Sequence, residues 1–297
     1  MKLQYEKQEL YHYTSLQALK SIIENKTIRL TDYRFLNDKT ELKYSIEVLH
    51  KYLLELKDKL KYYDKIIKDL SDLEKGITYT YNVKRVEKEK ILLEPAYHND
   101  TKFYILSMTD KSDDLALWSG YGKTGCCIKF NSQKLFDFFY RIRDRLFSIG
   151  LDNIVRGKIQ YGNGIANDEK QFLINIFNAP EAVLNIPYLL NQLCSLRKES
   201  AYKYESEYRI GLKYYDEWFS KTDDQGKFFA NKVFIEKDGF FKPQIEFNGF
   251  PIENGIIEEI TISPYNKSDI ALLGMQEFLF SNGLNEVKIQ TSNIKIR

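Results

Sequence analysis

The sequence predicts an α+β fold that forms a single domain over residues 1–297. The segment KYESEYRIGLKYY, residues 203–215, alternates charged and apolar side chains as a half-buried strand does. Between residues 42 and 70 the apolar side chains instead recur at helical spacing. No repeat, linker or low-complexity tract separates the two kinds of segment, so we expect strands and helices to share one core.

The composition indicates a reducing, aqueous environment. Lysine and arginine number 44 and aspartate and glutamate 42, so the net charge is only +2 and any basic surface must be local. The three cysteines form no Cys-x-x-Cys pair, and the adjacent Cys126 and Cys127 cannot join in a disulfide without strain. No segment approaches the roughly twenty apolar residues that span a bilayer. We therefore expect a cytoplasmic protein that does not bind membranes.

The first elements are a strand, a helix and a second strand. Residues 10–15 form the first strand, and Thr14 or Ser15 caps a helix whose apolar positions follow at helical spacing. Residues 28–42 then hold a short strand and a turn, where Asp38 and Glu41 are typical of a capping box that opens the next helix. His12, one of only three histidines, lies on the first strand between two tyrosines. It either fills a core position with a polar tip or holds a ligand.

The next segment predicts a helical insertion at about residues 40–99. Its apolar positions alternate steps of four and three, as in a coiled-coil seam: Leu42, Ile46, Leu49, Leu53, Leu56, Leu60, Tyr63, Ile67 and Leu70. After a break at Gly76, residues 83–97 show a similar spacing, so the two stretches are expected to fold back as a helical hairpin. The competing use of the seam is a dimer contact, which leaves a monomer or a homodimer. His50 and His98 have no partner at metal-ligand spacing, and no metal site is expected there.

The remaining elements alternate between the two kinds. Strands are expected at residues 102–110, 125–130, near 157–162, 203–215, 256–265 and 286–292, and helices at residues 132–147, 169–198 and 268–283.

The letters GYGKTG at residues 120–125 match a dinucleotide-binding fingerprint. However, Gly125 leads directly into the strand-like CCIKF rather than into a helix, so a turn is the better interpretation.

Two groups of residues are candidates for chemistry. Trp118 and Tyr121, beside glycines, either stack on a base or a nicotinamide ring or pack as a core plug. Glu205, Glu207 and Arg209 lie on one face of the predicted strand, where two carboxylates could orient a ribose hydroxyl and activate a nucleophile. The alternative for this face is an ordinary row of charges exposed to solvent.

Five segments together resemble, in order and over nearly the whole chain, a bacterial domain-of-unknown-function family (number 2971). They are YHYTS, FLND with Glu41, LWSGYGKTGCCIKF, KYESEYR and the terminal TSNIKIR. That family in turn resembles a divergent branch of the ADP-ribosyltransferases. The resemblance implies a split mixed/antiparallel β-sheet core with flanking helices, NAD as a substrate, and no metal.

The resemblance also implies roles for individual residues. The first-strand motif of His12, Tyr13 and Thr14 would hold the adenine-side ribose of NAD, and Ser107 loosely matches a serine on the second strand of the motif. Trp118 and Tyr121 would form the wall around nicotinamide. Glu207 would be the catalytic glutamate on the nicotinamide ribose, Glu205 the glutamate that precedes it, and Arg209 a phosphate-binding or structural partner.

These roles lead to two expectations of function. The first is an NAD-dependent ADP-ribosyltransferase, with NAD glycohydrolysis as its half-reaction, acting as a bacterial toxin or anti-phage defence effector on an acceptor that is protein, DNA or RNA. The second is a catalytically inactive relative that binds a nucleotide or nucleic acid and acts through its coiled hairpin.

Overall fold

The computed structural model of the chain describes residues 8–36, 41–75, 78–86, 90–98, 102–146, 154–164, 167–179, 182–214, 230–237, 239–266 and 268–296. Asp38, expected to open a capping box, and Gly76, the expected helix break, lie outside these residues. None of the helices in these ranges has both the length and the apolar character needed to cross a membrane.

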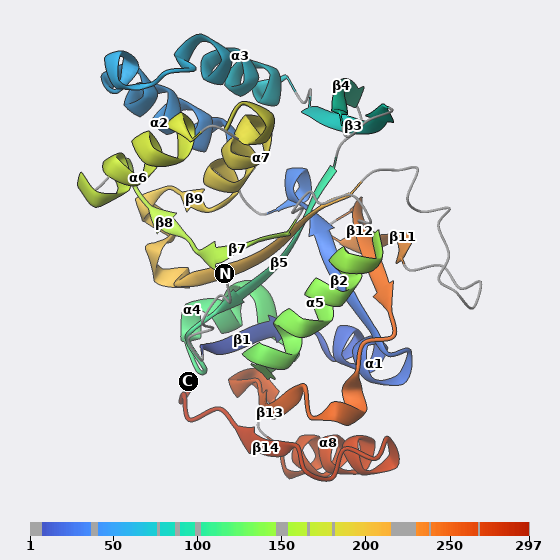
Figure 1. Ribbon diagram of the computed structural model, residues 1–297. Coiled ribbons are helices and arrows are strands. Elements are labelled where there is room, and N and C mark those ends of the chain that lie inside the picture. Colours follow the sequence, from blue (N-terminus) through green and yellow to red (C-terminus); the bar gives the residue numbers. More distant parts are fainter. Residues whose placement is uncertain are drawn as a thin grey trace.

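A large mixed sheet forms the centre of the described part of the chain (Figure 1). Its main path runs β11–β12–β2–β5–β1–β6–β13–β14, and β10 joins β5 to β7. The strands are β1 (Glu9–Thr14), β2 (Thr27–Asp32), β5 (Lys102–Thr109), β6 (Cys126–Asn131), β7 (Ile154–Lys158), β10 (Glu207–Tyr214), β11 (Ala230–Lys237), β12 (Phe240–Asn248), β13 (Ile257–Ile262) and β14 (Lys288–Thr291). Only the β13–β14 pair of this sheet is parallel. The expectation of a mixed, mainly antiparallel sheet with flanking helices is confirmed.

The two edges of β5 pair differently. One edge pairs with β10 along its whole length. The other edge pairs with β2 at Tyr104 and Ile105 and with β1 only at Thr109, so the sheet is split there. Helix α1 (Leu16–Glu24) connects β1 to β2, and Ser15 caps it by accepting a hydrogen bond from the backbone N–H of Ala18. The backbone between these two pairings on β5 therefore faces a gap that the connected β1, α1 and β2 surround.

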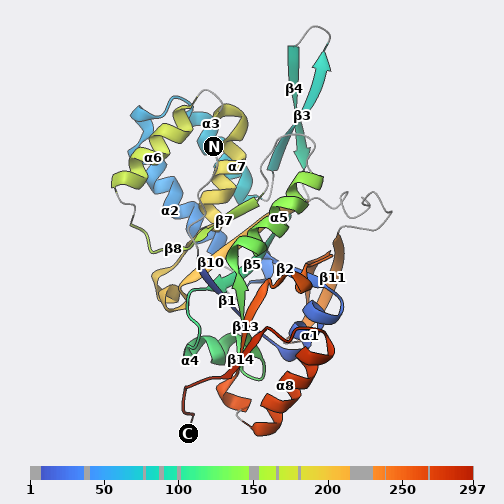
Figure 2. The same ribbon diagram turned by 60° about the horizontal axis from the view of Figure 1, so that its bottom comes forward.

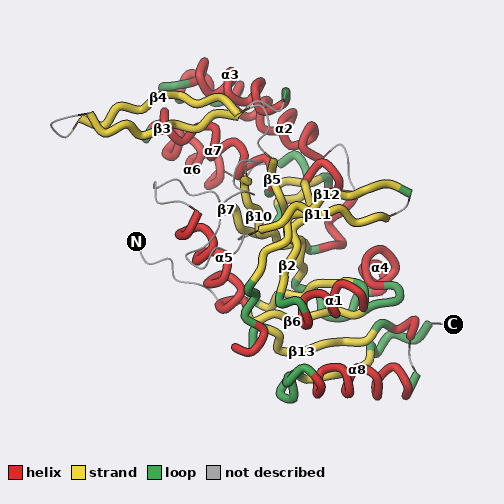
Figure 3. The backbone as a smooth tube through the Cα atoms, turned by 90° about the vertical axis from the view of Figure 1, so that its right-hand side faces the viewer, coloured by secondary structure: helices red, strands yellow, loops and turns green. Residues whose placement is uncertain are grey.

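The main core packs the sheet against three helices, and α1 contributes Leu19, Ile22 and Ile23 to it. Helix α5 (Ser132–Leu146) contributes buried aromatic side chains such as Phe136 and Phe139, which meet the strands as the expected amphipathic helix should. Helix α8 (Asp269–Ser281) contributes Met275 and Leu279. The helix runs alongside β13 (Figure 3).

A second core lies within a group of helices beside the sheet (Figure 1). It joins α2 (Glu41–Glu55), α3 (Tyr63–Glu74), α6 (Asn167–Asn178) and α7 (Ala182–Ser195). The helical stretch expected at residues 169–198 consists of α6 and α7, and it ends before the short strand β9 (Arg197–Lys198), which pairs with β8 (Gln160–Tyr161). Most seam residues are buried here, so the seam packs within the chain, but its partners are α6 and α7.

The expectation of a helical hairpin is wrong in its second half. Residues 78–98 form an antiparallel β-hairpin of β3 (Thr78–Val86) and β4 (Lys90–His98), which projects beyond the helices (Figure 2). Pro95 lies within β4, and a proline in a helix interior would remove a hydrogen bond and clash with the preceding turn. The seam is also not continuous, because α2 ends at Glu55 and α3 begins at Tyr63.

Candidate functional site

A cavity of about 490 Å³ opens where β1, β2 and β5 diverge, and α1 forms part of its wall. Its volume lies in the range of roughly 300–1,000 Å³ that is usual for pockets that bury small molecules. All but one of the residues predicted as a site from the sequence line it: His12, Tyr13, Thr14, Ser107, Tyr121, Glu205, Glu207 and Arg209. The structure thus brings together segments that are widely separated along the chain.

His12 spans the gap in the sheet. Its Nδ1 lies 2.8 Å from the carbonyl oxygen of Ser107, at the part of the β5 edge between the β2 and β1 pairings. Because a carbonyl only accepts, Nδ1 carries the proton, and in the neutral ring Nε2 is left as an acceptor. Burial lowers the pKa of His12, against the opposing effect of the hydrogen bond to Ser107. A neutral imidazole therefore lines the cavity at pH 7.

Tyr13 and Trp118 form a small core beside the cavity. Trp118 is 0% exposed, and its indole N–H donates to Asp113 at 2.6 Å. Its ring meets that of Tyr13 edge-on, with centroids 4.7 Å apart. The Tyr13 hydroxyl donates to the carbonyl of Lys111 and accepts from the N–H of Asp114. Of the two alternatives for Trp118, burial as a core plug is the one observed, and it is absent from the residues that line the cavity.

Tyr121, by contrast, is not buried in this small core. It lies on a single π-helical turn, η3 (Trp118–Gly122), that follows the short helix α4 (Leu115–Leu117). Asp114 caps this segment by accepting from the N–H groups of Ala116 and Leu117. Three residues beyond the buried Trp118, Tyr121 is 36% exposed, lines the cavity and donates its hydroxyl to Glu205 Oε1 at 2.7 Å.

The two glutamates belong to different elements. Glu205 ends the 3-10 helix η4 (Ser200–Glu205), and the backbone of Ser206 is left-handed with φ of 45°, so that β10 begins only at Glu207. Two hydrogen bonds hold this corner: Thr109 Oγ1 donates to the Glu205 carbonyl, and the Glu207 N–H donates to the hydroxyl of Tyr161, each at 2.7 Å. The strand expected from residue 203 is therefore shorter at its start, and the interpretation of its charged face as solvent-exposed is wrong.

Glu207 and Arg209 form the centre of a buried charge cluster. The Arg209 guanidinium donates to both carboxylate oxygens of Glu207, at 2.7 and 3.0 Å, and to both oxygens of Glu41. Lys198 Nζ lies 2.7 Å from Glu205 Oε2 and 3.3 Å from Glu207 Oε2. Two cations therefore offset two of the three carboxylates, which lowers the cost of burying these charges.

The cluster keeps Glu207 and Lys198 ionised. Burial alone would raise the pKa of the Glu207 carboxyl. The charges of Arg209 and Lys198, with hydrogen bonds from Arg209 and Ser107, outweigh burial and lower that pKa to about 2. Burial alone would lower the pKa of Lys198, but Glu207, Glu205 and Glu41 together raise it above its ordinary value. A carboxylate that stays negative at any physiological pH thus lies at the cavity wall.

Sequence reasoning missed part of this wall. Lys198 lies in LRKES, a stretch with no distinguishing pattern. Glu41, which pairs with Arg209 but does not itself line the cavity, was interpreted only as a helix cap and as part of the family resemblance. At another part of the wall, Arg29 pairs with Glu246 at 2.6 Å and donates to Ser21 Oγ at 3.1 Å. In the ranges that the structure describes, no three His, Cys, Asp or Glu side chains come together as a metal site.

Comparison with known proteins gives one match. Residues 117–210 match the model of a family described as "Protein of unknown function (DUF2971)". This stretch includes Tyr121, Lys198, Glu205, Glu207 and Arg209, and it supports the family resemblance found in the sequence. No curated protein and no solved structure matches the chain.

Proposed function

We propose that this chain, whose residues 117–210 carry the matched domain of unknown function, is an NAD-dependent ADP-ribosyltransferase. The observation that supports it best is the convergence on one cavity of the first-strand His12 and Thr14, the aromatic Tyr121 and the ionised Glu207. The resemblance assigns these residues to the adenine-side ribose, the nicotinamide ring and the nicotinamide ribose of NAD, respectively. The identity of the acceptor that is modified would decide whether the protein acts as a toxin or as an anti-phage effector.

The chemistry requires little machinery beyond this arrangement. Nicotinamide leaves with the electron pair of its bond to the ribose carbon, through a transition state with positive charge on the ribose. A carboxylate that accepts a hydrogen bond from the ribose 2'-hydroxyl stabilises that charge, and a partly enclosed cavity strengthens the effect by excluding water. A nucleophile on the acceptor then bonds to the same carbon and releases its proton. If water takes its place, the products are ADP-ribose and nicotinamide.

The charge cluster supplies the fixed carboxylate. Glu207 is held by Arg209 in a two-point contact that limits its rotation, and it needs no deprotonation before reaction because its pKa is about 2. Lys198 bridges it to Glu205, which Tyr121 also contacts from the cavity wall. Glu205 is accordingly placed to orient an acceptor while Glu207 acts on the ribose.

NAD binding provides the first test. The purified protein should gain thermal stability with rising NAD concentration, as a ligand that binds the folded state requires. His12→Ala should weaken this binding at least tenfold, while His50→Ala, on an exposed position of α2, should leave it unchanged. A melting temperature that does not respond to millimolar NAD would contradict the proposal.

Labelled NAD provides the second test. After incubation of the protein with isotopically labelled NAD and candidate acceptors, mass spectrometry of protein, DNA and RNA should detect an added ADP-ribose. Release of nicotinamide without any adduct would identify an NAD glycohydrolase instead.

The second candidate is an inactive nucleotide-binding protein. Both oxygens of Glu207 already accept hydrogen bonds from Arg209, and two cations offset its charge, which weakens its effect on a positive transition state. NAD that binds and stabilises the fold but is never cleaved would favour this candidate.

A further inference from the structure

Glu41, the first residue of α2, joins the charge cluster from the helical group rather than from the sheet. Both of its oxygens accept from Arg209: Oε1 from Nη1, and Oε2 from Nη2 at 2.9 Å. Glu41 is 7% exposed and is absent from the described residues that line the cavity. Any effect of Glu41 on a molecule in the cavity must therefore pass through Arg209.

Two helix ends hold the far side of the Arg209 guanidinium. Glu41 lies in the first turn of α2, where the partial positive charge of a helix N-terminus stabilises a carboxylate. The carbonyl of Ser195, the last residue of α7, accepts from Arg209 Nη1 at 2.9 Å, and a helix C-terminus favours a cation. Ser45 Oγ, one turn beyond Glu41, donates to the carbonyl of Arg197 at 3.0 Å and so ties α2 to β9. The helical group thus fixes the orientation of Arg209 from outside the sheet.

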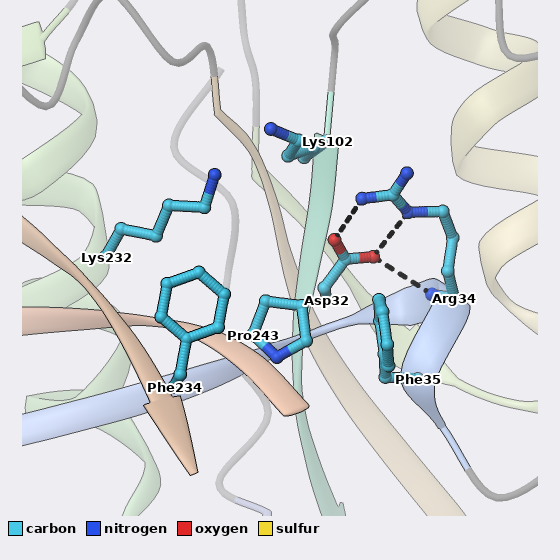
Figure 4. A pocket seen from close by; sticks show the side chains of 7 residues that line it. All are labelled: Asp32, Arg34, Phe35, Lys102, Lys232, Phe234 and Pro243. Atoms are coloured by element: carbon cyan, nitrogen blue, oxygen red, sulfur yellow. Dashed lines mark hydrogen bonds and ion pairs between the residues drawn. The ribbon is translucent and has the colours of Figure 1, made fainter. Parts of the chain in front are cut away.

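A second buried carboxylate provides a comparison. In a smaller pocket of about 290 Å³, both oxygens of Asp32 accept from the Arg34 guanidinium, at 2.6 and 3.0 Å (Figure 4). Among the described residues, Arg34 pairs with this one carboxylate, so the cation and the anion match. Arg209 differs because Glu207 and Glu41 share it.

Sharing leaves the charge cluster with an excess of negative charge. Glu41, Glu205 and Glu207 are set against Lys198 and Arg209. Without Glu41, the two cations would match Glu205 and Glu207, and positive charge that develops on the ribose would meet a neutral wall. With Glu41, part of the charge of Arg209 is drawn away from the cavity. The carboxylate of Glu207 then keeps more of its effect on that positive charge.

We propose that Glu41 is a positioning residue for NAD cleavage: by sharing Arg209, it holds Glu207 in place and preserves the negative charge that Glu207 directs at the ribose. Glu41 has this role only if Glu207 acts on the nicotinamide ribose, so the inference rests on the proposed function. Its effect belongs to the transition state more than to bound NAD, because the ribose becomes positive only as nicotinamide leaves.

Glu41→Gln tests this role, and Glu47→Gln, at an exposed position of the same helix, is its matched control. At saturating NAD, Glu41→Gln should release nicotinamide about tenfold more slowly or worse. The KM for NAD should change by less than about threefold, since the lost interaction acts in the transition state. Glu41→Asp, which keeps the charge but moves it back by one carbon, should lie between Glu41→Gln and the wild type. Glu47→Gln should match the wild type.

A double-mutant cycle separates positioning from a merely structural effect. In a Glu207→Gln background, Glu41→Gln should lower the residual turnover by less than about threefold, because the carboxylate through which it acts is gone. A full second loss of turnover would overturn the proposal, since Glu41 would then support the fold rather than Glu207.

Glu41→Asp keeps the proposal open to refutation if Glu41→Gln does not fold. Its turnover should fall by about threefold or more at an unchanged KM, and a wild-type rate would overturn the proposal. Failure of the proposed function gives a different result. A wild-type protein that releases no nicotinamide would contradict NAD cleavage and this inference together, whereas wild-type turnover in both Glu41 variants would contradict this inference alone.

Discussion

Glu207 is ionised although it is buried, and a buried charge requires compensating partners. It is 5% exposed, and desolvation of a carboxylate costs several kcal/mol unless partners compensate it. Arg209 and Lys198 provide that compensation, and Glu41 and the Ser195 carbonyl in turn occupy the remaining donors of Arg209. Well-packed apolar residues would stabilise such a site as well or better, so the cluster is better explained by what it does at the cavity wall.

Substitution of Glu207 by glutamine tests its role. Glu207→Gln keeps the shape of the side chain and leaves Arg209 paired with Glu41, so we expect a loss of stability of about 1–3 kcal/mol with a retained fold. Turnover of NAD should fall by about 10²–10³-fold while much of the binding remains, because the charge acts mainly in the transition state. Stopped assays of nicotinamide release at saturating NAD measure this.

Glu205→Gln is the matched control. It should impair transfer to the acceptor more than hydrolysis of NAD, since Glu205 accepts from Tyr121 on the cavity wall and does not contact the ribose in this assignment. A Glu207→Gln variant that turns over NAD at the wild-type rate would exclude the catalytic role. Equal losses in both variants would show that the division of roles is wrong.

Gly125, the last residue of GYGKTG, allows two backbone segments to approach closely. A Cβ built at this position would lie 1.9 Å from the Thr14 carbonyl oxygen and 2.8 Å from Ser15 Cα, so the glycine permits a close backbone approach next to the cavity. Gly125→Ala should therefore destabilise the protein by about 3 kcal/mol if β1 shifts to admit the methyl group, and by more if it does not. It should also weaken NAD binding, because Thr14 lines the cavity. Gly120→Ala, where nothing lies within 4 Å, should change stability by less than about 0.5 kcal/mol. Urea unfolding of both variants measures the difference, and equal effects would contradict this explanation.

At the scale of elements, the seam of α2 and α3 is the apolar face of a helical group rather than a coiled coil. The 4-3 spacing marks the residues that become buried, but the two helices are separate and pack on α6 and α7. A regular spacing specifies a face and not the partner that covers it, because any apolar helix face of matching shape removes the same area from water.

Neighbouring leucines of α2 test this packing. Leu53 is 0% exposed in the second core, whereas Leu54 is 57% exposed. Leu53→Asp should cost about 3–5 kcal/mol or prevent folding, because it buries a charge without a partner, and Leu54→Asp should cost less than about 0.5 kcal/mol. Chemical unfolding gives the free energies, and light scattering gives the mass. If Leu53→Asp instead converts a dimer into a stable folded monomer, the seam is an intermolecular contact.

At the scale of the whole molecule, the buried charges couple folding to pH. The pKa of Glu207 is about 2 in the folded protein and about 4.5 ordinarily, so the unfolded chain binds the proton more readily between these values. Its contribution to stability is therefore complete above about pH 4.5 and is lost as the pH falls toward 2. His12 acts in the same direction from a higher pH, because burial lowers its pKa below 6.5 and the unfolded chain protonates first.

The free energy of unfolding should accordingly fall in two stages on acidification. The first begins near pH 6.5 and is removed by His12→Ala, and the second begins near pH 4.5 and is reduced by Glu207→Gln. For Glu207 the effect is on the order of 3 kcal/mol. Urea unfolding across this pH range measures it. A Glu207→Gln variant whose acid sensitivity equals that of the wild type would show that this carboxylate does not have the lowered pKa.

Local pattern by itself determined much of this protein. The cap and apolar spacing after Ser15, the helix at residues 132–147 and the strand at residues 102–110 correspond closely to α1, α5 and β5, because short-range hydrogen bonding and periodicity decide such elements. The sequence also identified several polar residues of the cavity wall, since a histidine on an apolar strand and closely spaced glutamates are unusual enough to stand out.

Only the tertiary structure decided where those residues face. Alternation places Glu207 and Arg209 on one side of a strand, but whether that side meets solvent or a cavity depends on Glu41, 168 positions away, and on Lys198. Trp118 and Tyr121 are three residues apart and look equivalent in sequence, yet packing against Tyr13 buries the first and leaves the second at the cavity. Residues 83–97 had spacing compatible with a helix, but Pro95 disfavours a helix, and residues 78–98 pair with one another as a hairpin. For the charge cluster and for Trp118, the free energy comes from contacts between segments far apart in the chain, which no local pattern contains.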